Sequence, residues 1–284
     1  MQTNLKFLWL FSLVVFSFFV SCEKDESEPS AVVSGVKLLS NATFGSIITD
    51  NNGQTLYFFS RDAIGNSVCV DGCLNTWPIF YAENLQVGTG LKASEFSEIT
   101  RADGKKQTTY RGWPLYYYSP TTDGVFEAVG DTKGEAVNNV WFVAKPDYKI
   151  MLVNSQLVGH NGKSYLNNYT EGVGATSYFT DAFGRTLYRF TKDYFNTNKF
   201  TAADFINNGV WPVFYDELGA VPSIVDKTAF GKINVYGRDQ LTYKGNPLYY
   251  FGQDMSRGEN KGVSFPAPGV WPIVNTSTAQ APMP

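Results

Sequence analysis

The chain has 284 residues, of which 16% are aromatic and 17% charged, and its formal net charge at pH 7 is -3. A mildly acidic chain without clustered Lys and Arg argues against nucleic acid as a partner, because phosphate binding needs a concentrated basic patch. The length allows one large or two medium domains with a sizeable core.

Residues 1–21 have the pattern of a secretory signal. Lys6 supplies the positive start, and the apolar run from Phe7 to Val20 is too short for a comfortable membrane span. The run leads into Cys22, and the residues from Phe19 to Cys22 resemble a bacterial lipobox with Phe in place of the usual Leu. We therefore predict cleavage before Cys22 and its acylation, which would anchor the chain stably in a membrane. An ordinary secretory signal with an incidental Cys is the alternative.

Residues 22–35 are expected to form an acidic tether. The stretch from Glu23 to Ser30 is charged and lacks aromatic residues, which is typical of a solvated linker. Its Lys24-Asp25-Glu26 run resembles the surface-export signal of some bacterial lipoproteins, and a generic acidic tether is the alternative. We expect a protein that is lipid-anchored in the outer membrane and exposed at the cell surface. Its first partner would then be the membrane itself.

A short pattern occurs four times in the rest of the chain. Three copies have the form Tyr-x-aromatic-x-x-Asp. The remaining copy, at Tyr116, keeps only the first part, and its Asp lies further along the chain at Asp123. The motif residues are Tyr57, Phe59 and Asp62, then Tyr116 and Tyr118, then Tyr188, Phe190 and Asp193, and finally Tyr249, Phe251 and Asp254. Such repetition is the strongest indication of the architecture in the sequence, because it indicates a fold built from repeated units.

The four copies form a two-repeat unit that is duplicated. Trp77 matches Trp211 and Trp141 matches Trp271, in the same order and about 130 residues apart. We call residues 36–148 the first half and residues 149–275 the second half.

With these motifs the chain resembles the bacterial secreted-repeat lipoproteins, which are recognised by a Tyr-x-(Phe/Trp/Tyr)-x-x-Asp motif. The resemblance covers roughly residues 40 to 275. It implies an exported location and no particular activity.

Short strands dominate both halves. An Asp/Asn/Gly turn at residues 50–53 separates two β-rich arms and predicts a hairpin, which the turn at residues 181–184 repeats. Helical periodicity is scarce, with the best candidates at residues 93–98 and 201–207. We predict an all-β fold of four related hairpin-plus-strand repeats in two pseudo-symmetric halves. A sandwich or barrel-like stack is the first choice and a small propeller the alternative.

Two segments depart from the repeat. An insertion at residues 159–174, rich in Asn and Gly, is expected to be a surface loop, and loops are where repeat proteins often acquire function. The tail at residues 276–284 is small and Pro-rich, which predicts disorder.

Cys69 and Cys73 are the two cysteines of the exported chain besides Cys22. In an oxidising compartment a disulfide is the default, and their spacing permits one if the segment turns. The second half has Ala203 and Asn207 at the equivalent positions, judged by distance from the Trp of each half. A redox-active or metal-binding pair is the alternative.

No metal site and no cofactor are predicted. His160 is the only histidine, and it lies in the insertion without a partner motif, so a solvated loop residue is the expected role. The motif aspartates could serve as acid and base in glycoside hydrolysis. Their recurrence favours a structural joint, in which Asp caps the turn after each strand.

The leading functional hypothesis is a non-enzymatic surface lipoprotein that binds an unknown protein or glycan ligand or contacts the envelope. One alternative is an extracytoplasmic redox or metal-handling lipoprotein that uses Cys69 and Cys73, with His160 as a further candidate. The other is a glycan-binding or glycan-acting protein that uses exposed aromatic and Asp side chains, although core packing is the favoured role of the aromatics.

Overall fold

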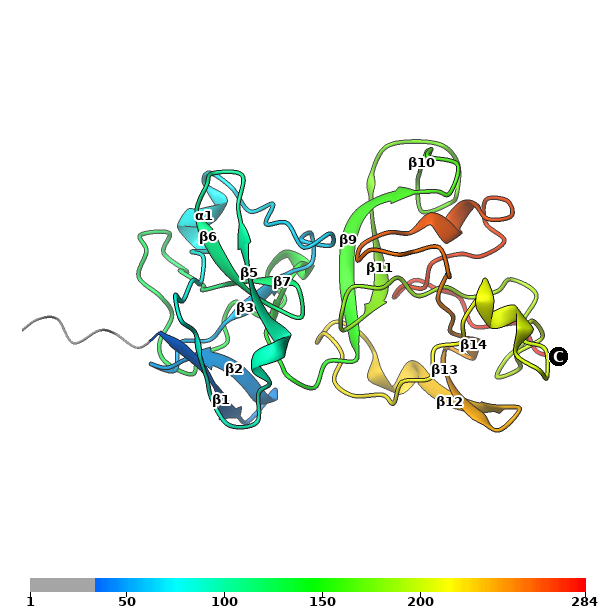
Figure 1. Cartoon of the computed structure of the whole chain (residues 1–284), viewed down its shortest axis with the longest axis horizontal. Coiled ribbons are helices and arrows are strands. Elements are labelled where there is room, and N and C mark those ends of the chain that lie inside the picture. Colours follow the sequence, from blue (N-terminus) through cyan, green and yellow to red (C-terminus); the bar gives the residue numbers. More distant parts are fainter. Residues whose placement is uncertain (1–33) are drawn as a thin grey trace, which may run out of the picture. The chain divides into compact units, whose positions relative to one another are not determined.

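The structure is a computed structural model that describes residues 34–284 (Figure 1). The predicted signal peptide and Cys22 lie outside the described residues. Within the described part, no helix has the length and apolar character needed to cross a membrane.

Strands supply most of the regular structure. In the first half they are β1 (Gly35–Asn41), β2 (Gly45–Asp50), β3 (Tyr57–Phe59), β4 (Gln86–Val87), β5 (Phe96–Thr100), β6 (Lys106–Tyr110), β7 (Trp113–Tyr116) and β8 (Trp141–Val143). In the second half they are β9 (Ile150–Val158), β10 (Ser164–Tyr165), β11 (Ala175–Asp181), β12 (Phe230–Val235), β13 (Arg238–Tyr243) and β14 (Asn246–Pro247).

Among residues 34–284, helical structure is limited to single turns. These are α1 (Cys73–Thr76) and the 3-10 turns η1 (Ala93–Glu95), η2 (Val137–Asn139), η3 (Ile206–Gly209), η4 (Lys227–Ala229) and η5 (Lys261–Ser264).

The strands form four sheets, two in each half. The orders are β2-β1-β4 and β5-β6-β7-β3-β8 in the first half, and β10-β9-β11 and β12-β13-β14 in the second (Figure 1). The all-β fold with repeated hairpin-like units is confirmed, and these sheets do not close into a barrel.

The pairing registers repeat between the halves. Tyr57 of β3 pairs with Tyr116 of β7, and Tyr188 pairs with Tyr249 in the same antiparallel way. The motif tyrosines therefore lie side by side at the centre of each half.

The predicted turns are present, and the arms next to the first one pair antiparallel: Thr49 and Thr55 form a bridge, and the Leu56 N–H donates to the Ile48 carbonyl at 3.1 Å. Beyond this short hairpin, β2 takes β1 as its longer partner. The reason is burial: pairing with β1 places Ile47 and Ile48 in the core with no exposed surface.

Stacked aromatic rings fill the core of each half. In the first half Trp77 stacks on Trp141 with ring centroids 3.7 Å apart, and Phe59 stacks on the other side of Trp141 at 4.0 Å. The equivalent stack in the second half consists of Trp211, Trp271 and Phe190. The repeat aromatics thus pack against one another rather than line an open groove.

The two halves contact each other directly. The Trp113 indole Nε1–H donates to the carbonyl of Ala182 at 2.9 Å. The Arg257 guanidinium lies 4.4 Å from the centroid of the Trp113 ring and donates to the carbonyl of Gly112. A buried hydrogen bond and a cation–π contact therefore join the halves.

The C-terminal tail differs from the prediction of disorder. The Ala281 N–H donates to the carbonyl of Lys244 at 3.0 Å, and the Asn246 amide donates to the carbonyl of Ala279 at 2.9 Å. The Ala281 side chain is 4% exposed. Small side chains let the tail lie flat on the second half, where its backbone groups find partners.

Candidate functional site

The motif tyrosines and carboxylates form buried pairs that cross between neighbouring repeats. Each Tyr hydroxyl donates to the carboxylate of the other repeat in its half rather than to its own. The pairs are Tyr116 with Asp62 at 2.7 Å, Tyr249 with Asp193 at 2.7 Å and Tyr188 with Asp254 at 2.6 Å. The exchange ties the two repeats of each half together.

The fourth pair uses Glu127, which the sequence pattern did not identify. The Tyr57 hydroxyl donates to the Glu127 carboxylate, and Glu127 is 5% exposed. Asp123, the Asp that the sequence pattern assigns to this copy, is exposed and accepts instead from the Thr121 hydroxyl and the Val125 N–H. A motif with fixed spacing does not find this position, because the loop between Tyr118 and the carboxylate is longer and the residue is Glu instead of Asp.

The other oxygen of each carboxylate accepts a backbone N–H from the following loop. The donors are Val68 to Asp62, Lys133 to Glu127, Lys199 to Asp193 and Lys261 to Asp254. Each carboxylate therefore connects the tyrosine of the neighbouring repeat to the loop that follows the carboxylate in its own repeat. Burial raises the pKa of Asp62 and Asp254 to about 7 and that of Asp193 to about 6.

The predicted disulfide between Cys69 and Cys73 is present, with a Cα–Cα distance of 5.4 Å. The buried Arg101 guanidinium donates to the Cys69 carbonyl at 2.8 Å and so holds the disulfide loop against the core. In the second half the Asn207 side chain accepts from the Ala202 N–H at 3.1 Å. An amide hydrogen bond closes this loop where the first half has a covalent bond.

No group of three or more His, Cys, Asp or Glu side chains among residues 34–284 could hold a metal ion. His160 is exposed, and its ring stacks on Phe265 with centroids 5.4 Å apart. Its backbone N–H donates to the Lys261 carbonyl. It lies at the edge of the candidate pocket.

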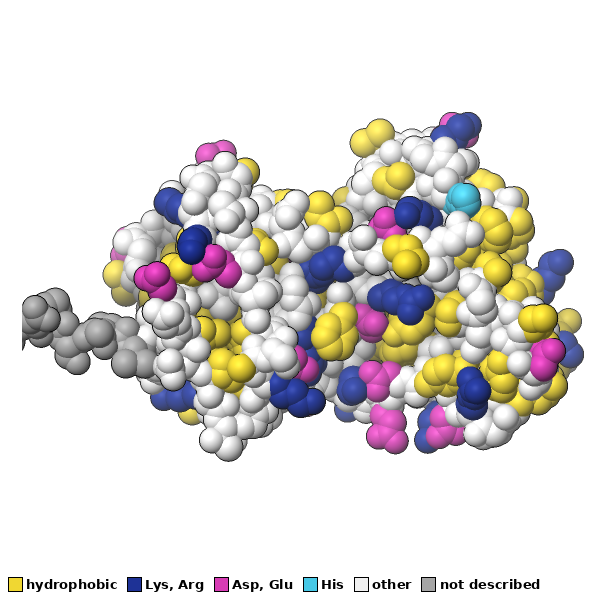
Figure 2. Space-filling model, in the orientation of Figure 1, with side chains coloured by type: hydrophobic (Ala, Val, Ile, Leu, Met, Phe, Trp, Pro, Cys, Tyr) yellow, Lys and Arg dark blue, Asp and Glu magenta, His cyan; other side chains and the backbone are white. Residues whose placement is uncertain are grey.

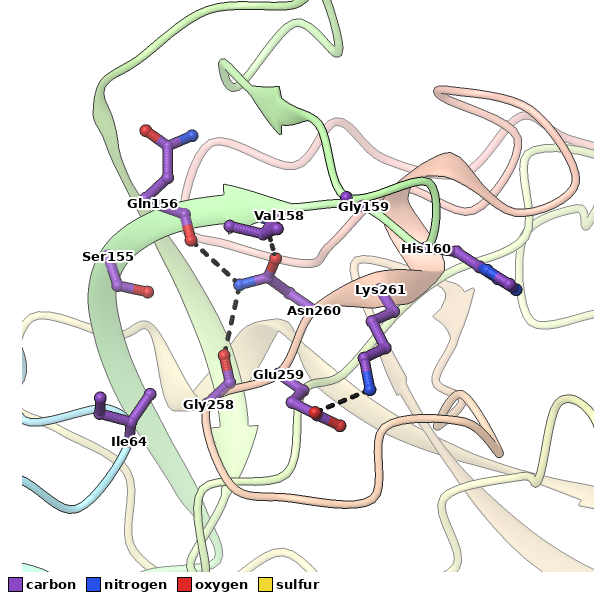
Figure 3. Close-up of a pocket in the computed structure, with 11 residues that line it drawn as sticks. Ile64, Ser155, Gln156, Val158, Gly159, His160, Gly258, Glu259, Asn260 and Lys261 are labelled. Atoms are coloured by element: carbon purple, nitrogen blue, oxygen red, sulfur yellow. Dashed lines mark hydrogen bonds and ion pairs between the residues drawn. The ribbon is translucent and has the colours of Figure 1, made fainter.

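A pocket of about 480 Å³ lies at the base of the insertion (Figure 3). The end of β9 and the loop at residues 258–261 form its floor and one wall, and Ile64 from the first half forms the opposite wall. The lining residues are Ile64, Ser155, Gln156, Val158, Gly159, His160, Gly162, Gly258, Glu259, Asn260 and Lys261.

Asn260 fixes the shape of the floor. Its side chain is 3% exposed; its oxygen accepts from the Val158 N–H at 2.5 Å, and its amide donates to the carbonyls of Gln156 at 3.2 Å and Gly258 at 3.4 Å (Figure 3). One side chain thus joins the end of β9 to the 258–261 loop.

The insertion is held by Gln156. Its side-chain amide donates to the Tyr165 carbonyl at 2.8 Å, and its oxygen accepts from the Gly174 N–H at 2.8 Å. Gly159 is required where the insertion leaves β9, because any Cβ there would collide with Ser264. In the first half, β1 and β2 are joined by a tight turn at residues 42–44, so the insertion that shapes this pocket has no counterpart there.

The chemistry of the pocket suits an apolar group. Ile64 and Val158 present aliphatic side chains that are 61% and 42% exposed. Glu259 and Lys261 pair with each other at 2.7 Å, and the His160 ring is turned away from the cavity (Figure 3). The Ser155 hydroxyl is engaged with the Tyr178 hydroxyl at 2.9 Å. No lining side chains form a nucleophile and base pair.

Sequence reasoning identified the insertion and His160 but missed Ile64 and Asn260. Ile64 reaches the pocket from a part of the chain about 90 residues earlier, so no local pattern connects it to the insertion. A buried Asn within a polar loop gives no sequence signal either.

A protein family described as a secreted repeat of unknown function matches residues 39–80, 97–145 and 233–275. No curated protein and no solved structure matches the chain significantly. The matched segments contain three of the four tyrosine motifs, and the fourth motif, at Tyr188, has the same pairing in the structure. The chain therefore contains three matches to this family of secreted repeats.

Proposed function

We propose that the protein is a non-enzymatic binding module at the cell surface, which holds a protein partner through an apolar side chain seated in the pocket beneath the insertion. The observation that carries this proposal is the pocket itself, whose mouth displays Ile64 and Val158 and whose polar floor is already hydrogen-bonded. A preformed, mostly apolar concavity is the usual form of a binding site.

A protein partner fits this pocket better than a glycan. Sugar rings are commonly held against the faces of aromatic side chains, and His160 is the only aromatic lining residue, with its ring turned outward (Figure 3). Two further apolar side chains are exposed on neighbouring loops, Met255 at 82% and Phe183 at 57%. Exposed apolar groups around a pocket are typical of a protein–protein contact.

The family match and the predicted signal at the start of the chain support the proposed location. A secreted repeat is an exported module. Acylation of Cys22 and the acidic tether would hold it in the outer membrane with the pocket outside the cell. The Cys22→Ala form is expected to leave the membrane fraction. Replacement of Lys24, Asp25 and Glu26 by Ala is expected to preserve acylation and to reduce access by external protease.

The binding proposal is tested by NMR titration of the exported protein with N-acetyl amino-acid amides. Leucine and phenylalanine amides are expected to shift the amide signals of Ser155 and Asn260, whereas serine amide is not. Val158→Lys should abolish the shifts because it places a charge at the apolar mouth. Val173→Lys is the matched control, since Val173 is 88% exposed on the same insertion and does not line the pocket. Equal loss in both variants would contradict the assignment.

The Cys69–Cys73 disulfide supports a structural role better than a redox function. Cys69 is 1% exposed, and its carbonyl is fixed by Arg101, so this segment is built as a structural brace. Mass spectrometry of the exported protein should find Cys69 linked to Cys73 with no bound metal.

A further inference from the structure

A loop of the first half exposes three apolar side chains close together. Val125 is 63%, Phe126 37% and Val129 64% exposed, although all three lie within five consecutive residues. The Phe126 ring stacks on Tyr117 with centroids 4.3 Å apart. We call residues 120–131 the apolar loop. It presents neighbouring apolar side chains to the solvent rather than isolated ones.

The apolar loop lies close to β1 and β2, the strands with which the described chain begins (Figure 1). Figure 2 shows that apolar side chains are exposed on the first half. The Gly130 N–H donates to the Gly53 carbonyl at 3.2 Å, and the Asn51 N–H donates to the Gly35 carbonyl at 3.1 Å. Val129 packs directly over Gly53. The loop and the first described residues therefore share one end of the first half.

The equivalent face of the second half is an interface. There the Gly258 N–H donates to the Gly184 carbonyl at 2.9 Å, as Gly130 does to Gly53. The residue before Gly258 is Arg257, which reaches across to Trp113 of the first half. At the same place the first half has Val129. In the second half this face contacts the other half through Arg257, and at the same place the first half exposes the aliphatic side chain of Val129.

We propose that the apolar loop is a second membrane contact, which seats Val125, Phe126 and Val129 in the surface of the bilayer that holds the acyl chains of Cys22. This proposal rests on the lipid anchoring proposed above. Only residues 23–33 separate Cys22 from the described chain. Even fully extended they span no more than about 40 Å, so the anchor keeps this end of the protein near the bilayer.

The chemistry of the loop fits a lipid surface. Aliphatic and aromatic side chains enter the boundary between headgroups and acyl chains, and a neighbouring Lys can pair with lipid phosphate. Lys37 lies at the same end, with its ammonium 2.7 Å from the Asn51 carbonyl. Three side chains form too small a surface for a stable protein dimer, which needs on the order of 1,000 Å². They can add to an anchor that is already in the membrane.

The test uses the full-length acylated protein in vesicles of phosphatidylethanolamine and phosphatidylglycerol. An environment-sensitive fluorescent amino acid replaces Val129 in one sample and Ile206, which is 77% exposed in the second half, in the control. The emission at position 129 is expected to shift to the blue and to be quenched by nitroxide-labelled lipid, and position 206 should report water. A Val125→Asp substitution should reduce the shift at position 129 while the protein still co-sediments with the vesicles.

Three results would overturn the proposal. A water-like emission at position 129 in protein that co-sediments would leave the anchor intact and exclude the loop contact. A blue shift that depends on protein concentration and resists lipid quenching would assign the loop to a second copy of the chain. Failure to co-sediment would contradict the lipid anchor itself and this proposal with it.

Discussion

Each buried carboxylate of the repeat joins two segments of chain, because one oxygen accepts from a tyrosine of the neighbouring repeat and the other from a backbone N–H. Removing a carboxylate leaves both donors without partners in a low-dielectric core, where an unpaired polar group is costly. This explains why the same residue type recurs at every repeat without forming a shared active site.

Glu127 should therefore matter more than Asp123, although Asp123 is the position that the motif pattern indicates. Glu127→Ala is expected to lower the free energy of unfolding by about 1–3 kcal/mol, because it leaves the Tyr57 hydroxyl and the Lys133 N–H without a hydrogen-bond acceptor. Asp123→Ala, at an exposed turn, should cost less than about 1 kcal/mol. Urea denaturation of the two variants measures the difference. Equal costs would show that Glu127 is not the fourth motif carboxylate.

The buried carboxyls also predict how stability depends on pH. Burial raises the pKa of Asp62 and Asp254 to about 7 in the folded protein, whereas an unfolded Asp titrates near about 3.9. Between those values the folded state binds more protons than the unfolded state, so stability is full below about pH 4 and falls as pH rises through about 7. Each carboxyl contributes a slope of up to about 1.4 kcal/mol per pH unit in that interval.

The midpoint of urea unfolding should accordingly be higher at pH 5 than at pH 8. Asp254→Asn should flatten this dependence, because the amide does not ionise. A midpoint that rises from pH 5 to pH 8 in the wild-type protein would show that these carboxyls are ionised throughout the range.

Among the elements, the two loops that precede Trp77 and Trp211 show that the same fold can be closed by different bonds. The carbonyl of Cys73 accepts from the Trp77 N–H at 2.9 Å, and the carbonyl of Asn207 accepts from the Trp211 N–H at the same distance. The loops end alike, although a disulfide closes the first and an Asn side chain the second.

Replacing Cys69 and Cys73 by Ser should lower stability modestly, by less than the roughly 2–4 kcal/mol typical of longer disulfide loops, because so few residues are enclosed. Arg101→Ala should cost more, since it removes donors to the Cys69 carbonyl and to the Gln107 side chain from a site that is 5% exposed. Urea denaturation of both variants shows which substitution lowers stability more. A larger loss of stability from the Cys replacements would show that the disulfide, and not Arg101, contributes most to holding this loop.

For the molecule as a whole, the sequence predicted the all-β class and the duplication well, because both depend on repeated local patterns. Turn residues and alternate apolar positions act over short distances, and they identified the turns at Asp50 and Asp181. The pairing of β2 with β1 was missed, since it is set by which strands can bury Ile47 and Ile48 together. Local pattern does not determine that choice.

The pocket could be predicted only in part, for the same reason. The insertion was visible as a break in the repeat, and His160 lies at its edge. The opposite wall, Ile64, comes from the first half, and its place depends on how the halves meet. That contact is made by Arg257 and Trp113, a pair with no counterpart elsewhere in the duplication, so the repeat pattern gives no signal for it.

Photo-crosslinking on intact cells tests the binding function most directly. A benzophenone amino acid in place of Val158 at the pocket mouth is compared with the same group in place of Val173, on the outer part of the insertion. A partner seated in the pocket should give a discrete protein adduct from position 158, which Ile64→Lys removes, and none from position 173. No adduct at position 158, or the same adducts at both positions, would contradict a binding site in this pocket.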